Sequence, residues 1–283
     1  MLAFFLACAS PQPAETPTAP VIVATSFPAW YLADRLTGVE VRCILPPGED
    51  SQGWQPDGAL IASLSVADLI VSSGAGFEAW MSTAALPESR VVDLSAGLNL
   101  IRQETTTHSH GVGGDHSHDG VDPHVWLDPS SYRVQAETLA EVLTERGLAV
   151  ADLPGLLAQL DALDAAYADH LSDPRLPVLL ANHPAYGYLA RRHALSIPSL
   201  DLDPQGLSGP APSVPEGAVL LWEEPPSDAV VAAIPARHVV LDPLEQPPVG
   251  GVYDYIAQSQ VNITRIAKLL AETPDGEHRH QQE

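Results

Sequence analysis

Short, uninterrupted apolar runs alternate with segments of helical periodicity, and this series occurs twice along the chain. Such runs suit strands buried on both faces, as in a parallel sheet. Alternation of strands with helices favours α/β lobes. The first series of strands is expected at residues 20–25, 39–45, 67–72 and 90–94, and the second at 177–181, 218–222 and 239–241.

Helices are expected between these strands, and two longer helical segments separate the two series. The segment 153–171 has apolar residues at a helical period and is long enough to run the height of a lobe. The sequence therefore predicts two α/β lobes with a helix between them. The expected helices are residues 29–36, 57–64, 77–85, 130–146, 153–171, 186–192, 227–234 and 253–270.

These patterns divide the chain into four parts: 1–19, an N-terminal lobe at 20–148, a linker helix at 149–172 and a C-terminal lobe at 173–283. Residues 1–10 resemble the end of a bacterial lipoprotein signal, with Cys8 as the lipidated residue. No basic residue precedes the apolar run, so a frayed apolar terminus is the alternative. The Pro-, Thr- and Ala-rich residues that follow have the composition of a tether.

The charge balance limits the partners of this protein. With 36 acidic and 13 basic residues, the formal net charge is −23, which disfavours nucleic acid and anionic lipid headgroups. The two cysteines, Cys8 and Cys43, cannot form a CxxC zinc site or a disulfide framework. After residue 27 no apolar run is long enough to span a bilayer.

Three polar residues lie where ligands are expected in an open α/β sheet. His183 and Asp242 follow predicted strands of the second lobe, and His124 lies in a loop of the first. Imidazole nitrogen and carboxylate oxygen are suitable Zn²⁺ ligands. Each residue alone would more often cap a helix or build a turn. Their joint placement indicates a metal site.

Other acidic and histidine residues could assist such a site. Glu223 and Glu224 follow the strand at 218–222, where they could orient a ligand imidazole or be surface charge. The stretch 102–123 lacks periodicity and is expected to be an irregular loop. Its histidines could capture metal ions, or the loop could simply be solvated: His108, His110, His116 and His118.

Several motifs together resemble one family. They are Pro46-Pro47-Gly48, Ala67-Asp68-Leu69-Ile70-Val71 before a Gly-x-Gly turn, Phe77-Glu78-Ala79-Trp80, the His-rich loop, Asp122-Pro123-His124-Val125-Trp126, His183 with Tyr186-Gly187-Tyr188-Leu189-Ala190, and Asp242-Pro243-Leu244. The chain is similar to the zinc- and manganese-binding solute-binding proteins of bacterial ABC importers. This resemblance implies two lobes joined by one long rigid helix, a metal in the cleft and no catalysis.

The chain departs from the family at one position. The family has a ligand histidine shortly after the Pro-Pro-Gly loop, whereas Gln52 stands there in this sequence. An amide oxygen is a weak donor, so the fourth position could belong to Gln52, to Glu49 or Asp50, to a histidine of the His-rich loop, or to water. The resemblance thus implies His124, His183 and Asp242 as ligands of Zn²⁺, with Mn²⁺ as the alternative.

The expected function is extracytoplasmic capture of zinc and its delivery to an ABC importer permease. The protein is expected to be a monomer in the periplasm or on the outer face of the cytoplasmic membrane, with a lipid tether at Cys8. A metal-dependent hydrolase, or an adhesin or metal buffer on the same scaffold, is the alternative. Because zinc needs neutral imidazoles, binding is expected to weaken below about pH 6.5.

Overall fold

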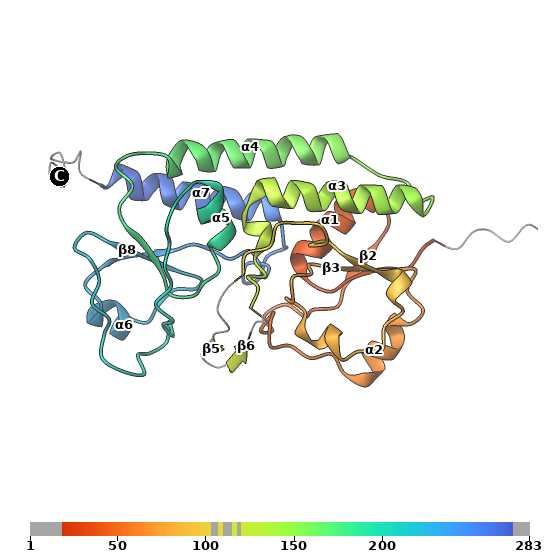
Figure 1. Ribbon diagram of the computed structural model, residues 1–283, viewed down its shortest axis with the longest axis horizontal. Helices are drawn as coiled ribbons and strands as arrows, with labels where there is room; N and C mark the ends of the chain where they lie inside the picture. Colours follow the sequence, from red (N-terminus) through yellow and green to blue (C-terminus); the bar gives the residue numbers. More distant parts are fainter. Residues whose placement is uncertain (1–18, 103–106, 110–114, 118–119, 274–283) are drawn as a thin grey trace, which may run out of the picture.

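The computed structural model of the protein describes residues 19–102, 107–109, 115–117 and 120–273. Two parallel sheets form two lobes (Figure 1). The N-terminal sheet has the strand order β2-β1-β3-β4 and the C-terminal sheet the order β7-β8-β9. The strands are β1 Ile22–Ala24, β2 Val41–Cys43, β3 Leu69–Ser72, β4 Val91–Asp93, β7 Leu179–Ala181, β8 Val219–Trp222 and β9 Arg237–Val240. The predicted fold class is confirmed.

Four strands are buried on both faces, and nearly all of their side chains are apolar. All residues of β1, β3, β7 and β8 are buried. Since neighbouring strands pair in parallel, their carboxyl ends lie along one edge of each sheet. The loops that leave this edge in the two lobes carry the candidate ligands.

The helices cover the sheets and join the lobes. They are α1 Phe27–Thr37, α2 Gly58–Leu64, α3 Pro129–Glu145, α4 Leu153–Leu171, α5 Gly187–Arg192, α6 Asp228–Ala233 and α7 Tyr255–Ala271, with 3₁₀ turns η1 Ala79–Ser82, η2 Glu88–Arg90 and η4 Val125–Leu127. Asp128 caps α3 by accepting a hydrogen bond from the Ser130 amide, and Pro129 occupies the first turn.

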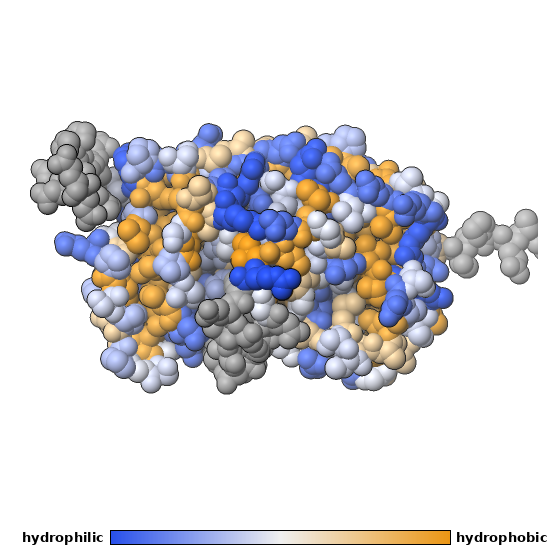
Figure 2. All heavy atoms as spheres, viewed as in Figure 1, coloured by the Kyte–Doolittle hydropathy of each residue, from blue (hydrophilic) through white to orange (hydrophobic). Residues whose placement is uncertain are grey.

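Helix α4 runs along both lobes and packs against α3 toward one end and α7 toward the other, with both helices beneath it in Figure 1. Leu156, Leu160 and Leu163 lie on its buried face, and each such side chain contributes about 1.5–3 kcal/mol by leaving water. Its outer face carries exposed residues such as Gln159 and Asp161, and hydrophilic residues are visible along this edge of the molecule in Figure 2. The pairing with α3 and α7 makes α4 a stiff connection.

One apolar core continues from the first lobe through these helices into the second. It includes Leu32 of α1, Leu139 of α3, Leu160 of α4 and Val219 of β8. Two smaller clusters cover the outer faces of the sheets. The lobes therefore share packing, and we retain the boundaries at 20–148, 149–172 and 173–283 as a proposal.

Two local expectations are corrected. The predicted helix at 77–85 is only the short turn η1, because the Glu78 carboxylate accepts hydrogen bonds from the amides of Ser73 and Gly74. The stretch 102–123 is not wholly irregular, since β5 Thr107–Ser109 and β6 Asp115–Ser117 pair antiparallel with His108 opposite His116.

The predicted lipid attachment at Cys8 and the predicted metal capture by His110 and His118 stay predictions, because these three residues lie outside the described residues. Among the residues that the structure describes, no helix is both long and apolar enough to cross a membrane.

Candidate metal centre

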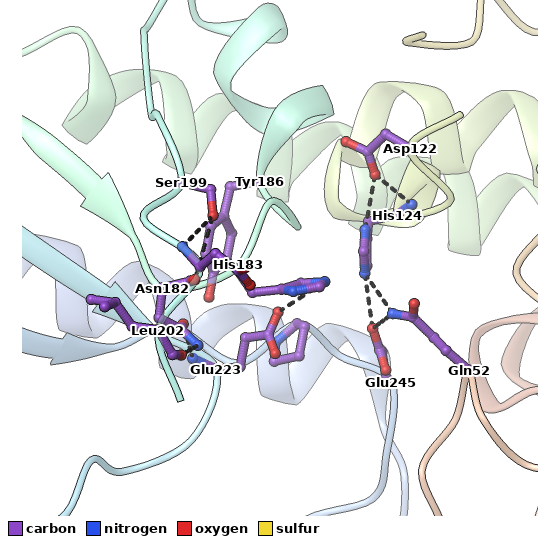
Figure 3. Close-up of polar contacts among 12 residues, drawn as sticks. Gln52, Asp122, His124, Asn182, His183, Tyr186, Ser199, Leu202, Glu223 and Glu245 are labelled. Atoms are coloured by element: carbon purple, nitrogen blue, oxygen red, sulfur yellow. Dashed lines mark hydrogen bonds and ion pairs between the residues drawn. The ribbon is translucent and has the colours of Figure 1, made fainter. Parts of the chain in front are cut away.

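The candidate site lies where the two lobes meet (Figure 3). His124 stands at the start of η4, on the loop that leads into α3. His183 follows β7, Glu223 follows β8, and Glu245 lies on the loop after β9. Gln52 comes from the loop between β2 and α2. Its side chain and those of His124 and Glu245 point toward one another in Figure 3.

His124 is held by carboxylates at both ring nitrogens. The residue is 1% exposed. Its Nδ1 lies 2.8 Å from Asp122 Oδ1, which also accepts a hydrogen bond from the His124 amide. Its Nε2 lies 3.0 Å from Glu245 Oε1. The Asp122 contact fixes the ring orientation and leaves Nε2 directed at the junction between the lobes.

These contacts change the protonation of the ring. Burial alone would lower the pKa of His124, but the hydrogen-bonded carboxylates of Asp122 and Glu245 raise that pKa to about 10. Without metal, the ring therefore carries a proton on both nitrogens at neutral pH and donates to both carboxylates. A metal that binds Nε2 has to displace one of these protons.

His183 approaches the same junction from the C-terminal lobe. The residue is 3% exposed, and its ring centroid lies 5.8 Å from that of His124. Its Nε2 lies 4.0 Å from Glu223 Oε1, which places Glu223 beside the imidazole. Glu224 instead accepts a hydrogen bond from Gln205 at the surface, and it lines the same cavity as His183.

Asp242 lies in this region but is engaged in building its own loop. Its Oδ1 accepts a hydrogen bond from the Leu244 amide, and its Oδ2 accepts one from Gln258. Asn262 of α7 hydrogen-bonds both the amide and the carbonyl of Asp242. Burial raises the pKa of Asp242, and the nearby charge of Glu245 adds to the increase. Asp242 also lines the cavity beside His183.

Glu245 is the residue that sequence reasoning missed. Its carboxylate contacts His124, as described, and accepts a hydrogen bond from Gln52 Nε2 at 3.2 Å. The chain reaches this position through Leu244, a buried non-glycine residue with a left-handed φ of 60°. The only signal in the sequence was the acidic residue three positions after Asp242.

Gln52 occupies the position beside His124 and is 5% exposed. Its Nε2 lies 3.1 Å from His124 Nε2. Because a doubly protonated His124 offers no acceptor, the Gln52 amide nitrogen donates to Glu245 only. The opposite atom, Gln52 Oε1, is buried and has no hydrogen-bond partner among the described residues. A half-turn of the amide would direct this oxygen at the site.

Two acidic cavities adjoin these residues. One, of about 250 Å³, is lined by His183, Glu223, Asp242 and Glu245. The other, of about 600 Å³, is lined on the opposite side by the loop of Glu49 and Asp50 and also reaches Glu223 and Glu245. These carboxylates would attract a divalent cation and repel anions.

The nitrogen and oxygen atoms that could bind a metal lie near one another, but their spacing is not that of a metal-bound site. Among the residues described, no three His, Cys, Asp or Glu side chains stand as a ready-made metal site. His124 Nε2 and Glu245 Oε1 are 3.0 Å apart because they share a hydrogen bond. Two ligands of a tetrahedral zinc, each about 2.1 Å from the metal, lie about 3.4 Å apart. A small separation of this pair would admit the ion.

The fold and this junction define a class, a two-lobed solute-binding protein with its candidate site between the lobes. Residues 22–214 match the model of the family described as zinc-uptake complex component A, periplasmic (ZnuA). The chain belongs to this family.

Two curated relatives are 27% and 24% identical to this chain, and both are longer than it. The chain is 27% identical over 212 residues to the zinc-binding lipoprotein AdcA of Streptococcus pneumoniae, a match that covers 68% of this chain and 40% of AdcA. It is 24% identical over 197 residues to the high-affinity zinc uptake system protein ZnuA of Bacillus subtilis, covering 65% and 61% of the two chains. The chain thus spans about 40% of the length of AdcA.

Solved structures share the fold. The Zn(II)-bound ZnuA-like domain of Streptococcus pneumoniae AdcA superposes with a TM-score of 0.70 at 20% identity, covering 90% of this chain and 99% of that domain. The solute-binding protein FpvC of Pseudomonas aeruginosa, in complex with Mn²⁺, superposes with a TM-score of 0.63 at 18% identity, covering 89% and 99%. Both likenesses establish the two-lobe fold of this chain.

Proposed function

We propose that this protein captures a divalent transition metal, with Zn²⁺ as the preferred ion, and delivers it to an ABC importer. The observation that carries the proposal is the convergence of His124 and Glu245, 3.0 Å apart, with the buried His183 ring 5.8 Å from that of His124. Two imidazoles and a carboxylate are a zinc donor set. They come from both lobes, so one ion would join the lobes.

We assign the metal-binding nitrogen of the first lobe to His124 Nε2, since its Nδ1 is occupied by Asp122. His183 supplies the second imidazole. We prefer Glu245 to Asp242 as the carboxylate ligand, because Glu245 Oε1 lies 3.0 Å from His124 Nε2, whereas the Asp242 oxygens accept hydrogen bonds from Leu244 and Gln258 that form the loop. Asp242 then positions Glu245, and Gln52 contributes its amide oxygen to the fourth position.

Binding exchanges a proton for a metal. In the protein without metal, the His124 proton bridges Nε2 and the Glu245 carboxylate. The incoming cation takes the place of this proton and keeps both groups paired with positive charge. Because the metal cation replaces the proton, the negative charges of the buried Asp122 carboxylate and of the Glu245 carboxylate stay balanced by a positive charge.

The surroundings favour capture over catalysis. A metal-dependent hydrolase keeps an open coordination position that faces a substrate pocket. Here Gln52 fills the position beside His124, and the smaller cavity is lined by acidic groups that would repel an anionic substrate. We therefore propose that the protein is not an enzyme. Manganese is the alternative cargo, since the donor set contains two oxygen ligands.

The proposed setting is outside the cytoplasmic membrane. Membership of a family described as periplasmic supports this location, and a lipid at Cys8 would hold the protein near an importer permease. A metal buffer or an adhesin on the same scaffold would bind the ion without passing it to a permease. Zinc transfer from the loaded protein to the permease, measured as uptake into vesicles, separates these functions.

A competition titration against a chromophoric zinc chelator tests the binding step. We expect the wild-type protein to bind one zinc ion per chain. Glu245→Ala should weaken binding by about 100-fold or more, because it removes a charged ligand. Glu216→Ala, at an exposed loop position, is the matched control. Wild-type affinity in Glu245→Ala would remove Glu245 from the ligand set.

A further inference from the structure

The loop that carries Glu245 is anchored from both lobes. The indole of Trp126 donates to the carbonyl of Pro243 at 2.8 Å, and the hydroxyl of Tyr253 donates to the carbonyl of Leu244 at 2.8 Å. Leu244 itself has a left-handed backbone. The base of the loop is therefore fixed, and Glu245 and its successor are the residues that reach across to the first lobe.

The residue after Glu245 spans the two lobes with its side-chain amide. Gln246 Oε1 accepts a hydrogen bond from the Gly48 amide at 3.0 Å. Gln246 Nε2 donates to the carbonyl of Glu49 and to Ser51 Oγ, each at 2.9 Å. Both ends of one amide thus bind the same short loop of the opposite lobe.

The backbone of Gln246 is held in its own lobe at the same time. Its carbonyl accepts a hydrogen bond from Gln258 Nε2 of α7 at 2.9 Å. Gln258 also contacts Asp242, so the brace extends to the start of the loop. Gln246 therefore connects α7 of the second lobe with residues 48–51 of the first.

These contacts lie next to two groups of the candidate site. Glu245 precedes Gln246, and Gln52 follows Ser51, so the two loops that Gln246 ties together are the loops whose side chains meet at His124 (Figure 3). For a metal held between the lobes to leave, Glu245 has to separate from His124. Gln246 has to release the loop at 48–51 for that loop to move with the first lobe.

We propose that Gln246 is a positioning residue whose amide ties the Glu245 loop to the Gly48–Ser51 loop and thereby sets the rate at which a bound divalent metal is released. This inference rests on the proposed function. The Gln246 side-chain hydrogen bonds go to Gly48, Glu49 and Ser51, none of which is a proposed ligand, so its loss leaves the metal's proposed donors in place. Loss of the Gln246 side chain is expected to change the dissociation rate of the metal and to leave the set of coordinating residues unchanged.

Metal release is measured by mixing zinc-loaded protein with excess EDTA in a stopped-flow instrument. Gln246→Ala removes all three side-chain hydrogen bonds, and we expect release about tenfold faster or more. Gln246→Glu keeps an acceptor for Gly48 but loses both donations, so it should also release faster. Gln205→Ala is the control, because Gln205 makes its side-chain hydrogen bond to Glu224 within one lobe.

The visible absorption of the Co²⁺-loaded proteins separates positioning from ligation. We expect the same spectrum in wild type, Gln246→Ala and Gln246→Glu, with wild-type release in Gln205→Ala. A wild-type release rate in Gln246→Ala would overturn the proposal, as would a changed Co²⁺ spectrum, which would mean that Gln246 shapes the donor set. A wild-type protein that binds neither ion would instead defeat the proposed function.

Discussion

Gly187 is predicted to control metal affinity without approaching the metal. A Cβ placed on Gly187 would lie 2.4 Å from Asp122 Oδ2 and 3.4 Å from the Ile101 Cδ1 atom. Asp122 is completely buried, so its carboxylate cannot swing into solvent. The variant Gly187→Ala therefore has to push the carboxylate that orients His124.

The size of the effect follows from this geometry. Real Cβ atoms do not come within 3.0 Å of a non-bonded atom, so Oδ2 has to move by at least about 0.6 Å, the difference between 2.4 and 3.0 Å. Asp122 Oδ1 moves with it and lengthens the 2.8 Å contact with His124 Nδ1. Losing one hydrogen bond to a charged group costs about 1.5–3 kcal/mol. We expect zinc affinity to fall by about 10- to 100-fold.

Competition titration of wild type, Gly187→Ala, Asp122→Asn and the double variant measures this coupling. Both single changes act through one contact, so their effects should not add in the double variant. Gly206→Ala is the control, because a Cβ there meets nothing within 4 Å. Unchanged zinc affinity in a folded Gly187→Ala protein would refute the reasoning, and full additivity would show that the two residues act separately.

Three further predictions concern the ligands and the proton. His183→Ala should weaken zinc binding by about 100-fold or more in the same titration, and wild-type affinity would remove His183 from the site. Gln52→His should tighten binding by supplying an imidazole, whereas Gln52→Ala should cost little because water can replace an amide oxygen; a Gln52→His protein no tighter than wild type would contradict this. Because the pKa of His124 is raised to about 10, its proton is bound throughout the neutral range and has to leave when zinc binds. Apparent affinity should therefore rise by about tenfold per pH unit from pH 7 to 9, and calorimetry in buffers of different ionisation enthalpy should detect one released proton; a flat profile would contradict this assignment.

Much of the fold follows from local pattern. The apolar runs predicted strands that are buried on both faces, and the helix at 153–171 begins and ends where its period indicated. The segment 77–85 has helical propensity, but the Glu78 carboxylate binds the amides of Ser73 and Gly74, and this competing hydrogen bonding leaves only a 3₁₀ turn.

The candidate site was less predictable because its geometry depends on one backbone conformation. Sequence placed His124 and His183 on loops that do converge, and it identified Gln52 as their neighbour. It favoured Asp242 as the carboxylate, because that residue directly follows a strand. The left-handed turn at Leu244 brings Glu245 to His124 as a second carboxylate, and nothing in a leucine codes for that turn.

The proton dependence also changes once the structure is known. The pKa of an isolated imidazole, about 6.5, predicted that zinc binding weakens below that pH. The pairing of Asp122 and Glu245 with the two nitrogens of His124 moves this competition to higher pH. Asp122 is close in sequence, but the contribution of Glu245 comes from a loop in the other lobe and depends on the tertiary fold.

A crystal structure of the zinc-loaded protein, with anomalous differences measured at the zinc absorption edge, tests the central claim most directly. The account predicts one anomalous peak at the junction of the lobes, about 2.0–2.2 Å from His124 Nε2, a nitrogen of His183 and a Glu245 oxygen. Asp122 should remain hydrogen-bonded to His124 Nδ1 in that structure. A zinc ion bound elsewhere, or one at the junction that Glu245 does not contact, would contradict the account.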